Sequence, residues 1–107
     1  MALTRDFRRT VVERVQRDPE FARALLDEAA TLFLNGEADA ARLVLRDLVN
    51  ATVGFETLAA ETEKPAKSLH RMLSKGGNPT MDNLAAILGV LRRKLGVELR
   101  AKAVEAA

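Results

Sequence analysis

The fold is decided by residues 58–73, which read LAAETEKPAKSLHRML. This stretch predicts one short helix that ends near Thr62, and a second helix that Pro65 opens and that runs to about Ser74. Proline suits the first turn of a helix because it has no amide hydrogen to leave unpaired. Two short helices joined by a turn of about three or four residues, the second of them amphipathic, form a helix-turn-helix.

The second helix of this pair has two chemically different faces. We expect an inward face that packs with Leu58 and carries apolar residues at i, i+3 and i+4, namely Leu69, Met72 and Leu73. Ala59 is small where the two helices would cross closely. The opposite face carries hydrogen-bond donors and no carboxylate: Lys67, His70, Arg71 and Ser74. Such donors can bond base edges in a DNA major groove, and the cations offset phosphate repulsion.

The charge of the chain is uneven, although its net value is only +2. Residues 1–53 carry 8 basic and 9 acidic side chains, whereas residues 64–95 carry 7 basic side chains against Asp82 alone. This local excess indicates a polyanionic partner, and its alternative is a chance cluster on a solvated face. The run Arg92-Arg93-Lys94 also has a second explanation, because cations are favoured near the C-terminus of a helix.

We therefore expect double-stranded DNA as a partner. Arg71 can bond guanine bidentately, and Lys67 lies one helical turn before it. Asn78 and Thr80 are expected to hold the following loop, with Thr80 as the N-cap of the last helix. The alternative is an ordinary helical hairpin whose charged side faces water. The predicted DNA-binding residues are Ala66, Lys67, Ser68, His70, Arg71, Lys75 and Asn78.

The remainder of the chain predicts more helices, and hence an all-α fold in a single domain of residues 1–107. Three helices are expected in residues 1–53: from about Thr4 to Arg17, from Pro19 to Asn35-Gly36, and over about 38–51. Phe7, Val11 and Val15 form the apolar stripe of the first, and Asp18 can cap the second. Residues 54–95 hold the helix-turn-helix, whose first helix spans about 56–62, and a last helix from Thr80 to about Leu95. The expected inward residues of the second and third helices are Phe21, Leu25, Ala29, Leu32, Phe33, Leu43, Val44, Leu45, Leu48 and Val49.

The C-terminal segment 96–107 has a different pattern. Val97, Leu99, Ala101 and Ala103 alternate with charged residues, which is typical of a strand. The chain offers no other strand to receive it. It must therefore fray, pack as coil, or pair with a copy of itself.

Composition excludes several classes of function. Apolar residues make up 48% of the 107 residues, enough for a buried core, and the longest apolar run is far too short to span a membrane. There is no cysteine, and His70 is the only histidine. The residues needed for a Cys- or His-based metal site or for His- or Cys-based catalysis are therefore missing. No Gly-rich phosphate loop follows a strand. We expect no enzyme, no cofactor, no signal peptide after Met1, and a cytoplasmic location.

Several tracts carry a family resemblance. They are Leu58-Ala59-Ala60-Glu61-Thr62, then Ser68-Leu69-His70-Arg71-Met72-Leu73-Ser74, then Gly77-Asn78-Pro79-Thr80, then Leu84, Leu88 and Leu95-Gly96-Val97-Glu98-Leu99. From about Gly54 to Leu99 the chain resembles the helix-turn-helix antidote proteins of bacterial addiction modules, the HigA-like antitoxins. The Gly-Asn-Pro-Thr tract is the most specific part, and the resemblance covers less than half of the chain. It implies a homodimeric repressor that also neutralises a RelE-like ribonuclease toxin.

The chain departs from the family pattern in two places. Glu63 stands at the turn position usually held by glycine, and Lys64 at the apolar position after it. A non-glycine residue with positive φ costs on the order of 1 kcal/mol, so the turn is expected to be strained or rearranged. The three helices of residues 1–53 also exceed the usual antidote leader, which leaves open a free-standing regulator of the same lineage.

The function predicted from sequence is that of a sequence-specific transcriptional regulator, a repressor of bacterial type with the antitoxin role as an extension. The competing interpretation is a protein-interaction adaptor. In that case the N-terminal helices hold a partner protein and the helix-turn-helix is vestigial.

Overall fold

Six helices make up the part of the chain that the computed structural model describes, which is residues 5–107 for the backbone and residues 9–107 for the side chains. They are α1 (Arg5–Arg17), α2 (Pro19–Leu34), α3 (Ala38–Ala51), α4 (Gly54–Thr62), α5 (Ala66–Met72) and α6 (Met81–Leu95). No strand occurs among these residues, so the all-α prediction is confirmed. The predicted helix start at Thr4 and the side chain of Phe7 lie outside the described residues. None of the described helices is long and apolar enough to cross a membrane.

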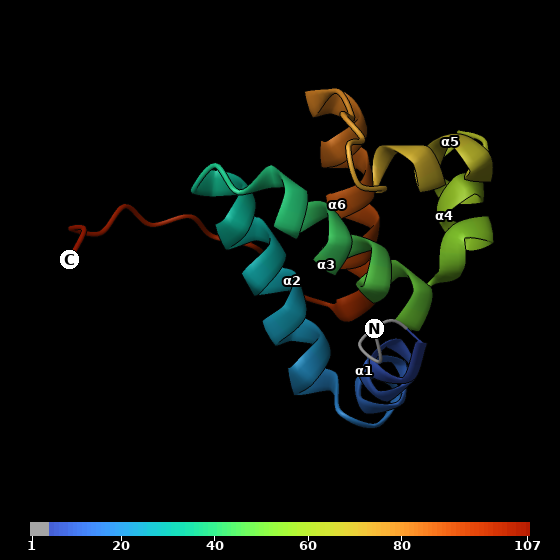
Figure 1. The fold of residues 1–107 in the computed structure, drawn as a ribbon, viewed down its shortest axis with the longest axis horizontal. Helices are drawn as coiled ribbons and strands as arrows, with labels where there is room; N and C mark the ends of the chain where they lie inside the picture. Colours follow the sequence, from blue (N-terminus) through green and yellow to red (C-terminus); the bar gives the residue numbers. More distant parts are fainter. Residues whose placement is uncertain (1–4) are drawn as a thin grey trace.

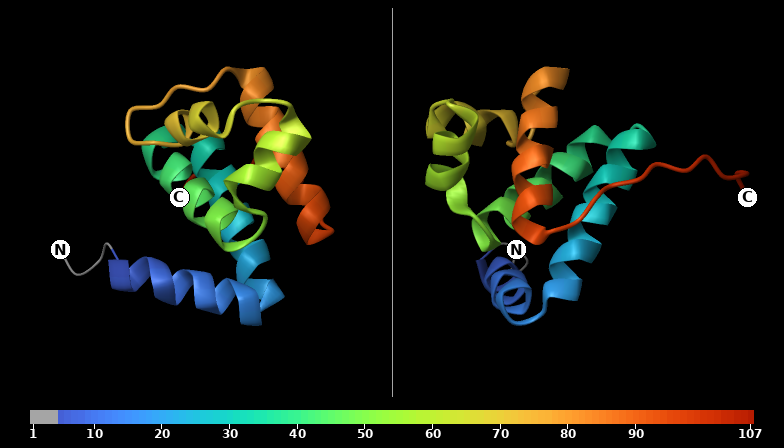
Figure 2. Two further views of the ribbon diagram at one scale, coloured as in Figure 1. Left: turned by 90° about the vertical axis from the view of Figure 1, so that its right-hand side faces the viewer. Right: turned by 180° about the vertical axis from the view of Figure 1, so that it is seen from behind.

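The helices form two groups around a shared core (Figure 1). α2 and α3 make the most extensive helix pair, and α1 packs across one end of it against both helices. α4 and α5 lie together on one side of α3, as the views in Figure 2 also show. α6 contacts both α2 and α4, and so joins the two groups.

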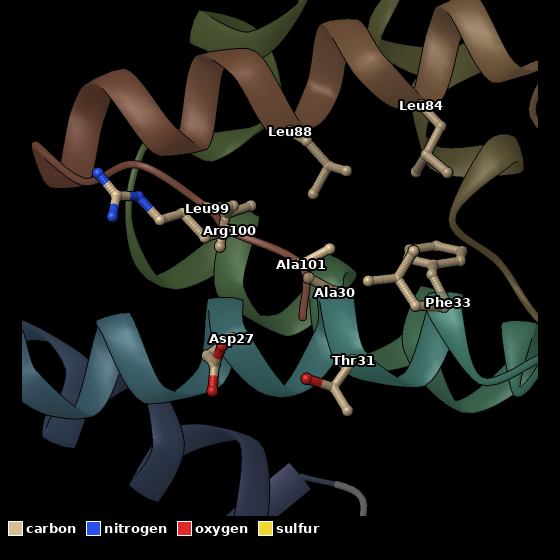
Figure 3. A pocket seen from close by; sticks show the side chains of 10 residues that line it. Asp27, Ala30, Thr31, Phe33, Leu84, Leu88, Leu99, Arg100 and Ala101 are labelled. Atoms are coloured by element: carbon tan, nitrogen blue, oxygen red, sulfur yellow. The ribbon is translucent and has the colours of Figure 1, made fainter. Parts of the chain in front are cut away.

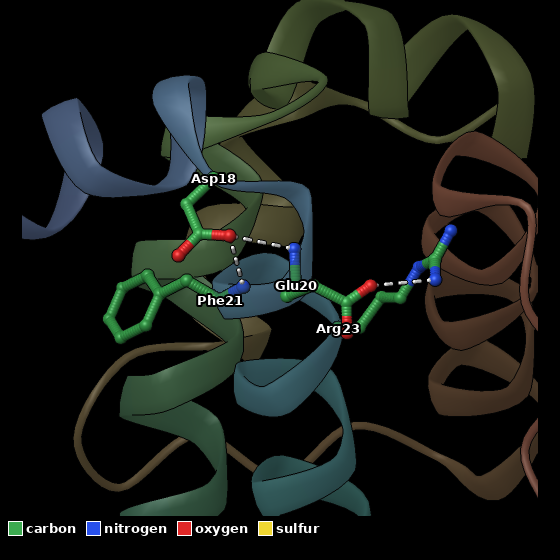
Figure 4. Close-up of polar contacts among 4 residues, drawn as sticks. All are labelled: Asp18, Glu20, Phe21 and Arg23. Atoms are coloured by element: carbon green, nitrogen blue, oxygen red, sulfur yellow. Dashed lines mark hydrogen bonds and ion pairs between the residues drawn. The ribbon is translucent and has the colours of Figure 1, made fainter.

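Local capping chemistry sets where α2 begins (Figure 4). The Oδ1 atom of Asp18 accepts hydrogen bonds from the backbone N–H groups of Glu20 at 3.1 Å and Phe21 at 3.4 Å, and Pro19 occupies the first turn. The predicted cap is therefore confirmed. The guanidinium of Arg14 lies 4.5 Å from the ring centroid of Phe21, a cation–π contact that ties α1 to α2.

A single cluster of buried side chains runs from α1 to α6. Its fully buried large members are Leu26, Leu45, Leu48, Leu58, Leu69, Leu73, Ile87, Leu91 and Val49. Leu26 was missing from the inward face predicted for α2, where Leu25 stood in its place. Leu25 is only half-buried, although it does pack against the cluster. Helices α1–α3 and α4–α6 thus share one core, so neither group buries its apolar face alone.

The segment after α6 is extended coil. Gly96 ends α6 in the left-handed region at φ 66°, and the N–H of Val97 returns to the carbonyl of Arg92 at 3.0 Å. Val97 and Leu99 are half-buried against the core while Glu98 and Arg100 are exposed, and every residue from Ala101 onward is exposed. The predicted alternation is present over these four residues. The predicted strand is absent from the single chain, because no neighbouring strand offers hydrogen bonds.

Candidate nucleic-acid interface

The predicted helix-turn-helix corresponds to α4, the three residues Glu63–Pro65 and α5 (Figure 1). α4 packs against α5 and also against α3 and α6, so the pair is held from behind. α4 begins at Gly54, two residues before its predicted start near Glu56. α5 ends at Met72, before the predicted end near Ser74, and the residues after it form turns.

The turn between α4 and α5 has one strained residue. Glu63 lies in the left-handed region at φ 57° and ψ 40°, the only non-glycine residue with positive φ in the described part of the chain. Its N–H and that of Lys64 both donate to the carbonyl of Ala59. The Ala59 carbonyl thus caps the end of α4, and the Ala59 side chain is partly buried against the core. The positive φ expected at Glu63 is confirmed, and the turn is strained rather than rearranged.

Buried side chains determine which face of α5 points toward the core. Leu69 and Leu73 have no exposed surface, and Met72 is half-buried against the same cluster. Leu58 of α4 is also fully buried, so all four predicted inward residues face the core. Burying a leucine completely contributes about 1.5–3 kcal/mol relative to leaving it in water. These contacts leave α5 no freedom to rotate about its axis, which determines its outer face.

The outer face of α5 is basic. Lys67, His70 and Arg71 are exposed, and so is Lys75 just beyond the helix. No acidic residue occurs between Lys64 and Lys75. Lys67, His70 and Arg71 thus share one exposed face of α5, which carries hydrogen-bond donors and no carboxylate of its own, and Lys75 follows beyond its end.

The remaining predicted contact residues lie differently. Ala66 and Ser68 are half-buried at the start of α5, and Asn78 is exposed in the loop before α6. Ser74 was predicted on the donor-rich face, but its hydroxyl donates to the carbonyl of Arg71 at 2.7 Å. The Ser74 side chain therefore stabilises the end of α5 instead of pointing freely to solvent.

His70 is held by an aromatic neighbour. Its imidazole stacks on the ring of Phe55 with 3.8 Å between ring centroids and 19° between ring planes. Phe55 belongs to α4 and is 6% exposed, so the stack joins the two helices of the motif. One face of the imidazole is therefore covered. Only its other face and its edge can reach a partner.

The backbone carbonyl of Ser74, at the end of α5, accepts two hydrogen bonds that were not predicted from the sequence. The carbonyl oxygen of Ser74 accepts hydrogen bonds from the N–H of Gly77 at 2.9 Å and from Nε of Arg42 at 3.2 Å. Arg42 comes from α3 and is 6% exposed, and its Nη2 also pairs with Asp39. The burial of Arg42 is seen only in the structure, so the sequence held no signal for this contact, although a buried charge of this kind needs a polar partner.

The loop passes so close to α5 that Gly77 has no room for a side chain. A Cβ atom placed on Gly77 would lie 2.4 Å from the carbonyl oxygens of both Arg71 and Met72. The last carbonyls of α5 are thus covered by the loop backbone. The end of the helix that carries Arg71 is fixed by the loop on one side and by Arg42 on the other.

The second basic cluster lies elsewhere. Arg92, Arg93 and Lys94 occupy the last turn of α6, and this end of α6 lies away from α5 in all views (Figures 1 and 2). Nη1 of Arg92 donates to the carbonyl of Val97 at 3.4 Å. This cluster is therefore explained by the end of its own helix, and the basic surface around α5 is separate from it.

Comparison of the chain with protein-family models, with curated proteins and with solved structures found no match. Function is therefore inferred from the geometry and charge of α4, α5 and their surroundings.

Proposed function

We propose that this protein is a sequence-specific DNA-binding regulator in which α5 is the recognition helix. One observation carries the proposal. The exposed side of α5 presents Lys67, His70 and Arg71 with no carboxylate on the helix itself, and the rotation of this helix is fixed by buried leucines. A major groove admits a helix of this kind, and base edges there offer mostly acceptors to such donors.

The side chains then divide into two roles. Arg71 and Lys67 are placed to read base edges, with Arg71 suited to the two acceptors of guanine. Lys75 lies beyond the helix and is suited to a phosphate contact, which positions the protein without reading sequence. The covered carbonyl of Ser74 fixes the backbone at the end of α5, so the Arg71 side chain starts from a defined position.

A regulator of this type needs two copies. One recognition helix contacts only a few base pairs, so proteins of this class usually bind two half-sites about 34 Å apart as two-fold dimers. We accordingly propose a homodimer on a palindromic site.

The experiment is a measurement of DNA affinity across a range of salt concentrations. With about 6 phosphate contacts per dimer, the slope of log K against log salt should be about −5. A slope near zero would contradict DNA binding and favour the adaptor interpretation.

A matched pair of variants locates the contact. Arg71→Glu and Arg93→Glu change the net charge equally, and both residues are exposed in the last turn of a helix. We expect Arg71→Glu to weaken binding by at least about tenfold, the equivalent of one lost base contact. Arg93→Glu should have little effect. Equal losses of DNA affinity in the two variants would show that the attraction is a general effect of net charge and not of contacts made by α5.

A further inference from the structure

The tail that follows α6 is an extended segment with free peptide groups. Its first residue, Val97, uses both its N–H and its carbonyl, the latter accepting from Arg92. Within the described part of the chain, residues 98–107 make no backbone–backbone hydrogen bond. The tail passes α2 and ends away from the helices (Figure 1). Exposed peptide groups in an extended segment are a template for pairing with another strand.

Unfilled apolar surface lies beside this segment. Leu84 and Leu88 of α6 point toward Ala30 and Phe33 of α2, and the tail passes between the two helices (Figure 3). The hollow there has a volume of about 280 Å³. A second hollow of about 570 Å³ follows the tail along the end of α2. Leu34 and Val104, which line it, are 69% and 74% exposed.

We propose that the occupant of this surface is a second copy of the chain, whose tail pairs antiparallel with this one about a two-fold axis at Arg100. The side chains of the tail are complementary to themselves in that register. Val97 then lies opposite Ala103, and Leu99 opposite Ala101, so each large apolar residue meets a small one. All four apolar residues of the alternation are paired, and the partner's strand extends toward the exposed Leu34.

Charge supports the same register. Glu98 lies opposite Lys102 on both sides of the axis, which gives two favourable cross-strand pairs. Arg100 meets its own copy, but each Arg100 is already paired through Nε with Oε1 of Glu98 in its own chain at 3.0 Å. A register centred on Ala101 would place Arg100 opposite Lys102 twice, and like charges opposite each other are destabilising. A register centred on Leu99 would also pair opposite charges, Glu98 with Arg100 on both sides, but it would place Ala103 opposite Leu95 inside α6 and so leave it unpaired.

This pairing does not depend on DNA binding, because it uses only the tail and the ends of α2 and α6. It deepens the proposed function by supplying the two-fold axis that a palindromic site requires. The two ideas are tested separately, since the oligomeric state is measured without DNA.

Single cysteines test the register. The chain has no cysteine of its own, and the Arg100 side chain is 87% exposed, so Arg100→Cys is a clean probe. Residues directly opposite in an antiparallel pair have Cα atoms within disulfide range, so Arg100→Cys should form covalent dimers on mild oxidation. Glu98→Cys and Lys102→Cys should each crosslink poorly alone, because like residues then lie about 14 Å apart. An equal mixture of these two variants should give a crosslinked heterodimer. Efficient crosslinking of either one alone would overturn the register.

Sedimentation of the full chain tests the dimer itself. The double variant Ala101→Pro with Lys102→Pro removes two adjacent N–H donors, one of which faces the partner in either phase of the ladder. Both residues are exposed and outside the core, so helical content should be unchanged. We expect a dimer for the native chain and dimerisation weaker on the order of tenfold for the variant. A dimer unaffected by the prolines, or a native chain that stays monomeric, would overturn the proposal.

Discussion

Nε of Arg42, in the first half of α3, donates a hydrogen bond to the carbonyl oxygen of Ser74 at 3.2 Å. These residues are 32 positions apart, and the bond joins α3 to the turn that ends α5. The three N-terminal helices therefore do more than contribute buried side chains to the core. They hold the end of the helix that carries Arg71, so the folding of residues 1–53 and the position of the proposed recognition helix are linked.

Replacing Arg42 tests this link. Arg42→Met keeps much of the apolar stem but removes the donor, and we expect the free energy of unfolding to fall by about 1.5–3 kcal/mol, as for a lost bond to a charged group. Arg42→Lys keeps the charge but lacks the planar guanidinium group. Its free energy of unfolding should lie between those of Arg42→Met and the native protein. Urea denaturation measures all three.

Asp39→Asn is the matched control for Arg42. Asp39 pairs with Arg42 but its side chain is 83% exposed, so losing its charge should cost no more than about 1 kcal/mol. If Asp39→Asn destabilised the protein as much as Arg42→Met, the ion pair rather than the bond to Ser74 would be the important contact.

Gly77→Ala tests the close approach of the loop to α5. A methyl group there would lie 2.4 Å from two backbone oxygens, which cannot move without disturbing the end of the helix. We expect a loss of about 1–3 kcal/mol or more in thermal or urea unfolding, as for overpacking at other tightly packed sites.

Gly76→Ala provides the comparison. Gly76 has φ 82° and nothing within 4 Å of an added Cβ, so its substitution carries only the cost of a left-handed conformation, about 1–2 kcal/mol. A smaller effect at Gly77 than at Gly76 would mean that the loop moves away from α5 without penalty.

Features with local chemistry could be predicted from the sequence. Asp18 before Pro19 predicted the start of α2, Thr80 predicted the cap of α6, and Thr80 Oγ1 does accept from the N–H of Asn83 at 3.1 Å. The bounds of α3 follow from an uninterrupted helical period between Gly36 and Thr52. Positive φ at Glu63 was implied by the family resemblance, because glycine usually holds that turn position. Each of these depends on residues within a single segment of the sequence.

Features that depend on distant neighbours could not be predicted. Leu25 and Leu26 are adjacent and equally apolar, so the period alone cannot say which is fully buried, and the packing of α2 on α3 decides for Leu26. The partner of Arg42 comes from a different part of the chain. The stack of His70 on Phe55 requires the angle between α4 and α5. The alternation predicted for the tail is present only from Val97 to Arg100, and a strand needs a neighbour that a single chain does not have.

Glu63→Gly should stabilise the protein. Glu63 has φ 57°, which costs a side-chain-bearing residue about 1 kcal/mol that glycine avoids. We expect a gain of about 0.5–1 kcal/mol, because the greater freedom of glycine in the unfolded chain offsets part of the relief. Glu63→Ala distinguishes the effect of backbone strain from the effect of the charge, since alanine keeps the strained conformation and removes only the carboxylate. If alanine stabilised the fold as much as glycine, electrostatic repulsion rather than strain would be the cause.

The final prediction concerns which side chains read sequence. Arg71 and Lys67 lie on the exposed side of α5, whereas Lys75 lies beyond its end. Side chains that bond base edges discriminate between bases, while side chains that bond phosphates attract all sequences alike. We therefore expect Arg71→Ala and Lys67→Ala to relax base preference at defined positions, by about 1–3 kcal/mol each, and Lys75→Ala to weaken binding evenly.

Selection from a random DNA library separates these roles, because it reports preference independently of overall affinity. The native protein and Lys75→Ala should yield the same motif, with Lys75→Ala binding every selected sequence more weakly and with a shallower salt dependence. Arg71→Ala should lose preference at symmetric positions of the two half-sites, since each copy in a two-fold dimer presents the same residue. His70→Ala is a further comparison in the same selection. The imidazole is stacked on Phe55, so only its other face and its edge are free to contact a base. If Arg71→Ala and the native protein selected the same motif, Arg71 would not be a base-reading residue, and α5 would serve only to place charge near the phosphates.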